Sequence, residues 1–271
     1  MGIYVKLEKK TFTTDDGVTL AYFEYGTGEQ AVVLLAGYGA PAITWCVQMK
    51  ALAKAGLRCI ALDRRCHGLS EVTDKGMNML RHGQDVHNLF EEIGLRDAVL
   101  VGQSQGASTM WSYISQYGTG RLRAVVSVDQ TPKMVNSDGW TLGMYGLTPE
   151  TRPTFFDKPL AAPNKKPLDK GLVFYLAVNG KGYPKFDRDV TKPLLLDHAD
   201  ADWRGTVAGT DVPALFIAGS ESPFWPSAHA EAMAQTAPKG SAYVVKGSGH
   251  AVNWECAKEF NRVLLNFIAG L

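Results

Sequence analysis

The 271-residue sequence predicts an α/β fold, in which a mostly parallel, twisted sheet of about eight strands carries helices on both faces. Two observations carry this prediction. Short, continuous apolar runs such as residues 31–35 and 98–101 are typical of strands buried on both faces. Helix-like segments alternate with such runs along much of the chain, which favours parallel strands joined by crossover helices. Hydrophobic residues make up 45% of the sequence, enough for the core of one large domain.

The first half of the chain supplies most of these elements. Residues 4–13 and 18–25 alternate polar and apolar side chains, which predicts two antiparallel strands joined by a turn at Asp15-Asp16-Gly17. The run at 31–35 ends shortly before Gly37 and predicts a buried strand. The elements that follow are a helix over 43–55, a strand over 57–62, an amphipathic helix over 77–93 that stops at Gly94, a strand over 98–101, a helix over 107–117 and a strand over 124–128.

The character of the sequence changes after residue 132. Residues 133–206 are rich in proline, lysine, aspartate and aromatic residues and show no strong strand pattern. This predicts a cap or lid inserted into a core made of residues 1–132 and 207–271. The alternation then resumes with a strand over 213–218, a helix over 228–235, a strand over 242–246 and a closing amphipathic helix over 253–268.

Composition and charge narrow the classes of function. There are 28 basic and 27 acidic residues, a net charge of +1, and no basic face, so nucleic acid is not expected as a partner. No apolar run is long enough for a membrane span, and residues 1–10 lack the apolar core of a secretory signal. The four cysteines form no CxxC pair, which fits reduced thiols in a cytoplasmic protein better than a disulfide framework or a zinc site.

The pentapeptide Gly102-Gln103-Ser104-Gln105-Gly106 predicts a nucleophile. It lies between the strand over 98–101 and the helix over 107–117. A sharp turn there forces the serine into a strained backbone conformation, and the two glycines relieve the crowding because they have no Cβ. The Ser104 hydroxyl would then stand at the top of the sheet, at the positive end of a helix.

A serine hydroxyl needs a base to remove its proton at neutral pH, and histidine suits this task. His250 is the best placed of six histidines. It lies in Gly247-Ser248-Gly249-His250, after the last predicted strand and before the closing helix, so it follows the serine in the order that the motif requires. Surface or structural roles are expected for the other five, which are His67, His82, His87, His198 and His229.

The chain now resembles the α/β-hydrolase family over nearly its whole length. Besides the elbow and the terminal Gly-His, residues 63–70 are similar to the family's D-x-R-G-H-G-x-S segment, with Cys66 at a glycine position. Leu35-Ala36-Gly37-Tyr38 is similar to the family's oxyanion loop, with Ala36 where histidine is common. The resemblance implies the α/β-hydrolase fold with a cap, no metal or organic cofactor, and an oxyanion hole built from the backbone N–H groups of Tyr38 and Gln105.

The acid of the triad is the open question. Most family members carry it after the strand that runs here over 213–218, but this chain has Ser222 at that position, and serine cannot balance the charge of an imidazolium. Glu221 lies one residue before the usual acid position. Asp129 ends the strand over 124–128, 25 residues after Ser104, where haloalkane dehalogenases and cofactor-free quinolone dioxygenases of the family place their acid. The sequence favours Asp129 and leaves Glu221 as the alternative.

The predicted cap is rich in aromatic residues, which suit an apolar wall for a substrate as well as simple packing. Gln103, Trp140, Tyr145 and Trp225 are the residues that we expect at the substrate pocket.

The function predicted is a serine hydrolase for a small carboxylic ester or lactone, with Ser104 as nucleophile, His250 as base and Asp129 as acid. Carbon–carbon bond hydrolysis and perhydrolysis use the same triad. A quinolone-type dioxygenase would use His250 and Asp129, but its elbow is G-H-S-H-G, whereas this chain has Gln103 and Gln105. A ligand-binding member without activity is the remaining alternative. Haloalkane dehalogenases use an aspartate nucleophile and do not fit.

Overall fold

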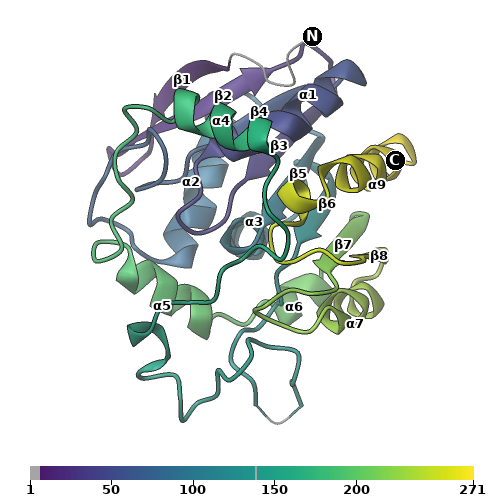
Figure 1. Cartoon of the computed structure of the whole chain (residues 1–271). Coiled ribbons are helices and arrows are strands. Elements are labelled where there is room, and N and C mark those ends of the chain that lie inside the picture. Colours follow the sequence, from purple (N-terminus) through teal and green to yellow (C-terminus); the bar gives the residue numbers. More distant parts are fainter. Residues whose placement is uncertain (1–6, 138) are drawn as a thin grey trace.

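Eight strands form one sheet in the computed structural model, which describes residues 7–137 and 139–271 (Figure 1). Their order is β1-β2-β4-β3-β5-β6-β7-β8. The strands β1, β2 and β4 pair antiparallel, and all neighbours from β4 to β8 pair parallel. The strands are β1 (Glu8–Thr13), β2 (Thr19–Tyr25), β3 (Ala31–Leu35), β4 (Arg58–Leu62), β5 (Ala98–Gln103), β6 (Leu122–Val128), β7 (Ala214–Gly219) and β8 (Gly240–Val245).

Helices cover both faces of this sheet, so the predicted three-layer α/β architecture is confirmed (Figure 1). The apolar sides of α1 and α9 pack on one face, and those of α2, α3, α6 and α7 pack on the other. The helices are α1 (Cys46–Lys54), α2 (Met79–Glu92), α3 (Gln105–Tyr117), α4 (Lys170–Asn179), α5 (Lys192–Asp200), α6 (Arg204–Ala208), α7 (Ala228–Thr236), α8 (Val252–Glu255) and α9 (Ala257–Ala269).

The strand β5 shows why the apolar runs are continuous. Ala98 and Leu100 pack into the core on the α2–α3 side, while Val99 and Val101 pack into the core on the α1–α9 side. All four side chains are fully buried. A strand with both faces covered cannot carry alternating polar residues, because each would need a hydrogen-bond partner in the core.

Most predicted elements differ from the observed ones by one or two residues at an end, and three differ in other ways. The first strand begins at Glu8, and residues 4–6 of the predicted range lie outside the described residues. The first predicted helix opens with a tight 3₁₀ turn over Ala42–Trp45 before α1. The closing helix is divided into α8 and α9, because Cys256 has a non-helical backbone with φ −127° and ψ 41°. Hydrophobic periodicity continues through such a break, so the sequence pattern does not reveal it.

The segment between β6 and β7 contributes no strand to the sheet within its described residues. It carries a 3₁₀ turn at Phe155–Asp157 and the helices α4, α5 and α6. Lys133 and Asp202 form an isolated β-bridge, so the two ends of the segment lie side by side where it leaves the core. We retain the division into a core of 1–132 with 207–271 and a cap of 133–206 as a proposal.

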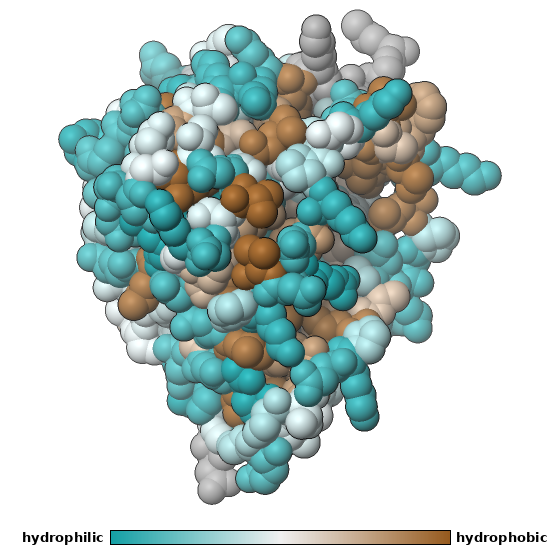
Figure 2. All heavy atoms as spheres, turned by 90° about the vertical axis from the view of Figure 1, so that its left-hand side faces the viewer, coloured by the Kyte–Doolittle hydropathy of each residue, from teal (hydrophilic) through white to brown (hydrophobic). Residues whose placement is uncertain are grey.

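On the face drawn in Figure 2, hydrophilic residues predominate and hydrophobic residues form small, separate patches. Within the described part of the chain, no helix combines the length and the apolar character needed to cross a membrane.

Candidate active site

Ser104 forms the turn between β5 and α3, with φ 54° and ψ −129°. A positive φ is unfavourable for a residue with a Cβ and is retained only where the surrounding structure enforces it. The neighbours explain the two glycines. A Cβ on Gly102 would lie 2.5 Å from the backbone of Ala107, and a Cβ on Gly106 would lie 2.2 Å from the carbonyl oxygen of Leu35. The backbone therefore has room only for glycine at both positions. The turn places Ser104 at the start of α3.

Asp129 also has a strained backbone, with φ 44°, and its side chain is completely buried. Its carboxylate is fully engaged. The Oδ2 atom lies 2.7 Å from His250 Nδ1 and accepts a hydrogen bond of 2.7 Å from the Ser222 hydroxyl. The Oδ1 atom accepts a hydrogen bond of 2.8 Å from the backbone N–H of Gly219. The structure thus joins the end of β6, the end of β7 and the loop after β8 at one carboxylate.

Ser222 and Glu221, the two residues near the usual acid position, have different surroundings. Ser222 donates to Asp129, so the serine that replaces the usual acid supports the carboxylate that contacts His250. Glu221 is 44% exposed and forms an ion pair of 3.1 Å with Lys165. Its carboxylate is directed to the surface, and the structure does not bring it to His250.

Two histidines set the electrostatics of Asp129. Burial alone would raise the pKa of this carboxyl, but the interactions with the His229 and His250 imidazoles outweigh burial and hold the pKa at about 2. His229 Nε2 lies 3.9 Å from Asp129 Oδ1, and the His229 ring is 1% exposed. Asp129 is therefore ionised at neutral pH. His229 was missed as a site residue, because its place on α7 gives no local signal.

The orientation of the His250 ring follows from its partners. Since an ionised Asp129 can only accept, His250 Nδ1 carries the proton, and Nε2 is left as an acceptor. The Gln103 side-chain amide lies 3.3 Å from this Nε2 atom and donates to it. In this structure the basic nitrogen of His250 is therefore hydrogen-bonded to the Gln103 side chain.

Arg64 lies beneath the predicted oxyanion loop and is 2% exposed. Its guanidinium donates to the carbonyl oxygen of Gly37 at 2.9 Å and to the side-chain oxygen of Gln105 at 2.7 Å. Its other contacts are His67 Nε2 at 3.1 Å and His82 Nδ1 at 3.2 Å. Burial, followed by the charge of Arg64, lowers the pKa of both imidazoles well below its usual value, so they accept as neutral rings.

The contact between Arg64 and Gly37 bears directly on Tyr38. The Gly37 carbonyl and the Tyr38 N–H belong to one peptide unit, and in a trans peptide they point in opposite directions. Holding the carbonyl on the guanidinium therefore fixes the direction of the N–H. Burial lowers the pKa of Arg64 to about 9, so the group stays charged at neutral pH.

The Tyr38 side chain ties this loop to the predicted cap. Its hydroxyl lies 2.8 Å from the Thr191 hydroxyl, and its ring meets Phe186 edge to face at 4.9 Å between centroids. On the other side of the site, the backbone N–H of His250 donates to the carbonyl of Pro163 at 2.8 Å. The segment between β6 and β7 is thus hydrogen-bonded to both the Tyr38 loop and the His250 loop.

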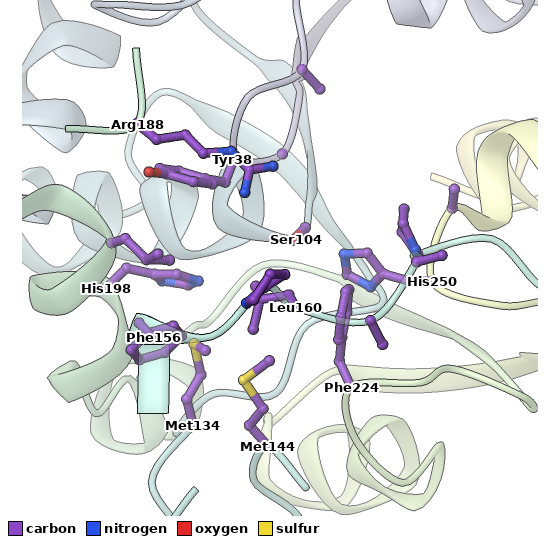
Figure 3. A pocket seen from close by; sticks show the side chains of 18 of the residues that line it. Tyr38, Ser104, Met134, Met144, Phe156, Leu160, Arg188, His198, Phe224 and His250 are labelled. Carbon is purple, nitrogen blue, oxygen red and sulfur yellow. The ribbon is translucent and has the colours of Figure 1, made fainter. Parts of the chain in front are cut away.

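A cavity of about 720 Å³ opens between these loops (Figure 3). Ser104 and His250 face it, and Gln103 and Tyr38 line it. Its volume lies within the range that is usual for small-molecule sites. The apolar part of the wall includes Met134, Met144, Phe156, Leu160, Phe224 and Trp225.

The structure places two of the four expected pocket residues, Gln103 and Trp225, at this cavity and corrects the other two. The Trp140 indole donates to the carbonyl of Lys133 at 2.9 Å and packs under Arg204. Tyr145 is 53% exposed and is not in the wall of this cavity, but lines a smaller hollow that adjoins it. Aromatic composition does not tell which side of an irregular segment faces a cavity, which explains both errors.

Among residues 7–137 and 139–271, no group of three His, Cys, Asp or Glu side chains is arranged to hold a metal ion. The described residues offer a hydroxyl and an imidazole that face one cavity, a buried carboxylate bound to that imidazole, and a backbone N–H on a peptide that a buried guanidinium binds.

Comparisons with known proteins agree with this fold. Residues 32–263 match the model of the alpha/beta hydrolase family. A non-heme chloroperoxidase, CPO-A1, of Kitasatospora aureofaciens is 28% identical, and the match covers 94% of this chain and 98% of that protein. A bifunctional esterase/perhydrolase of Acinetobacter calcoaceticus is 25% identical, with coverage of 94% and 98%. The crystal structure of a bromoperoxidase from Bacillus anthracis superposes with a TM-score of 0.82 at 26% identity and covers 97% of this chain and 100% of that one.

Proposed function

Since this chain belongs to the alpha/beta hydrolase family, we propose that it is a serine hydrolase that cleaves a small carboxylic ester or lactone through an acyl-enzyme. One observation carries the proposal. Ser104, on a strained turn, faces the same cavity as His250, whose ring is held by the buried carboxylate of Asp129 at 2.7 Å. The substrate is a small molecule in this proposal, and a cytoplasmic location stays a prediction.

The proposed reaction begins when Ser104 displaces the Gln103 amide from His250 Nε2. His250 then accepts the hydroxyl proton while the Ser104 oxygen attacks the ester carbonyl carbon. The N–H groups of Tyr38 and Gln105 stabilise the negative charge on the carbonyl oxygen. His250 returns its proton to the leaving alcohol, and a water deprotonated by His250 releases the acid from Ser104.

Asp129 acts in this proposal by orienting His250 and balancing its charge when the ring becomes an imidazolium. The hydrogen bonds from Ser222 and Gly219 support this role, because they hold the carboxylate in one position. Glu221 takes no part.

Arg64 is assigned a positioning role, since it binds the carbonyl of the peptide that carries the Tyr38 N–H, and the side chain of Gln105, without touching the substrate. We expect Arg64→Met to lower kcat for p-nitrophenyl acetate by about 10- to 100-fold, less than the loss of a complete oxyanion donor. The KM value should change little. Arg64→Lys keeps the charge but lacks the planar guanidinium that makes both hydrogen bonds. Its kcat should therefore lie between those of the native chain and Arg64→Met.

Affinity for a boronic acid that forms a tetrahedral adduct with Ser104 provides the second measurement for Arg64. It should fall in parallel with kcat, because the adduct presents its oxygen to the same donors. Thermal unfolding shows which variants are folded. A folded Arg64→Met variant with native kcat and native boronate affinity would rule the positioning role out.

Perhydrolysis is a second proposed activity of the same site. The relatives named esterase/perhydrolase, chloroperoxidase and bromoperoxidase favour it. Hydrogen peroxide would replace water and attack the acyl group on Ser104, so that the acyl carbon gains a peroxy oxygen and Ser104 recovers its proton through His250.

One assay tests both activities. We expect p-nitrophenyl esters of increasing acyl length to be hydrolysed, and hydrogen peroxide to divert part of the acetyl group to peracetic acid, detected by its oxidation of iodide. The Ser104→Ala chain is the blank for both products. Peracid no higher than this blank would remove the perhydrolase proposal. Oxygen uptake with a 3-hydroxy-4-quinolone, without ester hydrolysis, would instead support a dioxygenase.

A further inference from the structure

A second histidine faces the cavity that contains Ser104. His198 lies on α5, is 4% exposed, and lines the cavity wall. Figure 3 shows its ring directed into the cavity from the side opposite His250, with Ser104 between them. The proposed reaction uses only His250, so His198 has no part in the chemistry described above.

The His198 ring is polar, neutral and incompletely satisfied. Its Nδ1 atom is buried and has no hydrogen-bond partner among the described residues. Burial lowers the pKa of His198 to about 3, and the charges of Arg64 and His250 add to this effect. A neutral imidazole has one N–H to donate. The His198 ring, which lines the cavity, can therefore offer an N–H group to a ligand there.

The charged side chains around the cavity indicate what that partner is. Lys192 is neutralised by Asp157 at 3.2 Å. Arg188 and Lys158 also line the cavity, and neither forms an ion pair with a carboxylate of the described residues. Besides Asp157, the only carboxylate among the described lining residues is that of Asp189. The cavity therefore carries an excess of positive charge, which favours an anionic ligand.

Arg188 lies in the segment just before α5, ten residues before His198 in the sequence. In Figure 3 its side chain extends over Tyr38 on the cap side of the cavity. Burial raises the pKa of the Tyr38 phenol, and the charge of Arg188 opposes this rise, which agrees with their proximity. Arg188 and His198 can thus serve one end of the cavity, away from the Asp129–His250 pair.

We propose that the substrate of this site is an ester that carries a carboxylate away from the scissile bond, and that His198 and Arg188 bind this carboxylate. The proposal rests on the proposed function and deepens it. The apolar wall formed by Met134, Met144 and Leu160 would hold the methylene chain between the ester and the carboxylate. The guanidinium supplies the charge, and the neutral imidazole supplies a further donor.

Binding to the Ser104→Ala chain tests this without turnover. We compare monomethyl adipate, which carries one carboxylate, with dimethyl adipate, its uncharged counterpart, by calorimetry at physiological salt. The monomethyl esters of glutaric and suberic acid vary the chain length. Because charge-assisted hydrogen bonds are stronger than neutral ones, the monoanionic ester should bind about 10- to 100-fold more tightly than the neutral one.

Variants in this background locate the subsite. His198→Phe keeps a ring of similar size without its polar atoms, and Arg188→Gln removes the charge at an exposed position where folding is not at risk. Both should lower the preference for the monoanionic ester at least fivefold. Asp189→Asn, which removes a negative charge from the same wall, should keep or increase it. The controls are His87→Phe and Arg123→Gln, at a histidine and an arginine outside the cavity, and both should leave the preference unchanged.

Equal affinity for the two adipate esters would overturn the proposal. So would a preference that survives both His198→Phe and Arg188→Gln, and a loss in Arg188→Gln alone would overturn the role of His198. Since these are binding measurements, they remain decisive even if the native chain cleaves no ester. Lack of cleavage, together with a clear anion preference, would refute the proposed function and leave the carboxylate subsite standing.

Discussion

Ser104→Ala should lower kcat for p-nitrophenyl acetate by about 10⁶-fold, the scale of losing the nucleophile of a serine hydrolase. The Cβ remains, so the strained turn at φ 54° is unchanged and the protein should melt at nearly the native temperature. The hydroxyl contributes little to binding of the ground state, so ligand affinity should be kept. Initial rates and thermal unfolding of the purified variant provide the measurement.

Ser108→Ala is the matched control for this prediction. Ser108 lies one turn further along α3, is 1% exposed, and its hydroxyl has no hydrogen-bond partner among the described residues. Its replacement removes the same atom from the same helix, and kcat should stay within about twofold. A Ser104→Ala chain that keeps more than about one hundredth of native kcat would show that another group is the nucleophile.

The second large effect is expected at Asp129. In Asp129→Asn the amide keeps the shape of the side chain, but it no longer provides a charge, and it can stabilise the wrong tautomer of His250. We expect kcat to fall by about 10⁴-fold. Glu221→Gln is the comparison, and it should stay within about twofold because Glu221 pairs with Lys165 at the surface. A collapse in Glu221→Gln with native rates in Asp129→Asn would reverse the assignment.

A rescue variant separates the loss of a catalytic carboxylate from damage to the fold. The Ser222 hydroxyl lies 2.7 Å from Asp129 Oδ2, the oxygen that contacts His250. Adding Ser222→Asp to the Asp129→Asn chain therefore places a carboxylate within reach of the same imidazole. We expect it to restore kcat at least tenfold. A double variant that is folded and no faster than Asp129→Asn would argue that Asp129 does more than orient His250.

The fold could be predicted because its determinants are local. A run such as Ala31–Leu35 is buried on both faces and must be apolar throughout. The turn at 15–17 could be predicted because an Asp-Gly sequence favours a turn, and Gly17 adopts φ 83° there. The elbow at Ser104 was predicted because two close backbone approaches exclude any residue but glycine at positions 102 and 106. In each case the sequence itself carries the constraint.

The parts that were missed depend on contacts between distant segments. Arg64 occupies a variable position of its motif, and its role emerges only from contacts to Gly37 and Gln105, 27 and 41 residues away. His198 and Arg188 lie in a segment without clear periodicity, so nothing in the pattern shows which side chains face the cavity. The contact of Asp129 with His250 spans 121 residues, and the sequence could rank that carboxylate first only through a resemblance.

Covalent labelling with a fluorophosphonate tests the central claim most directly. The reagent needs an activated serine and an oxyanion hole, and it does not depend on knowing the natural substrate. Intact-mass measurement of the native chain should show one adduct, and peptide mapping should place it on Ser104. The Ser104→Ala chain should remain unlabelled, and Asp129→Asn should label much more slowly. A native chain that gains no adduct, or gains it at another residue, would contradict the serine-hydrolase account.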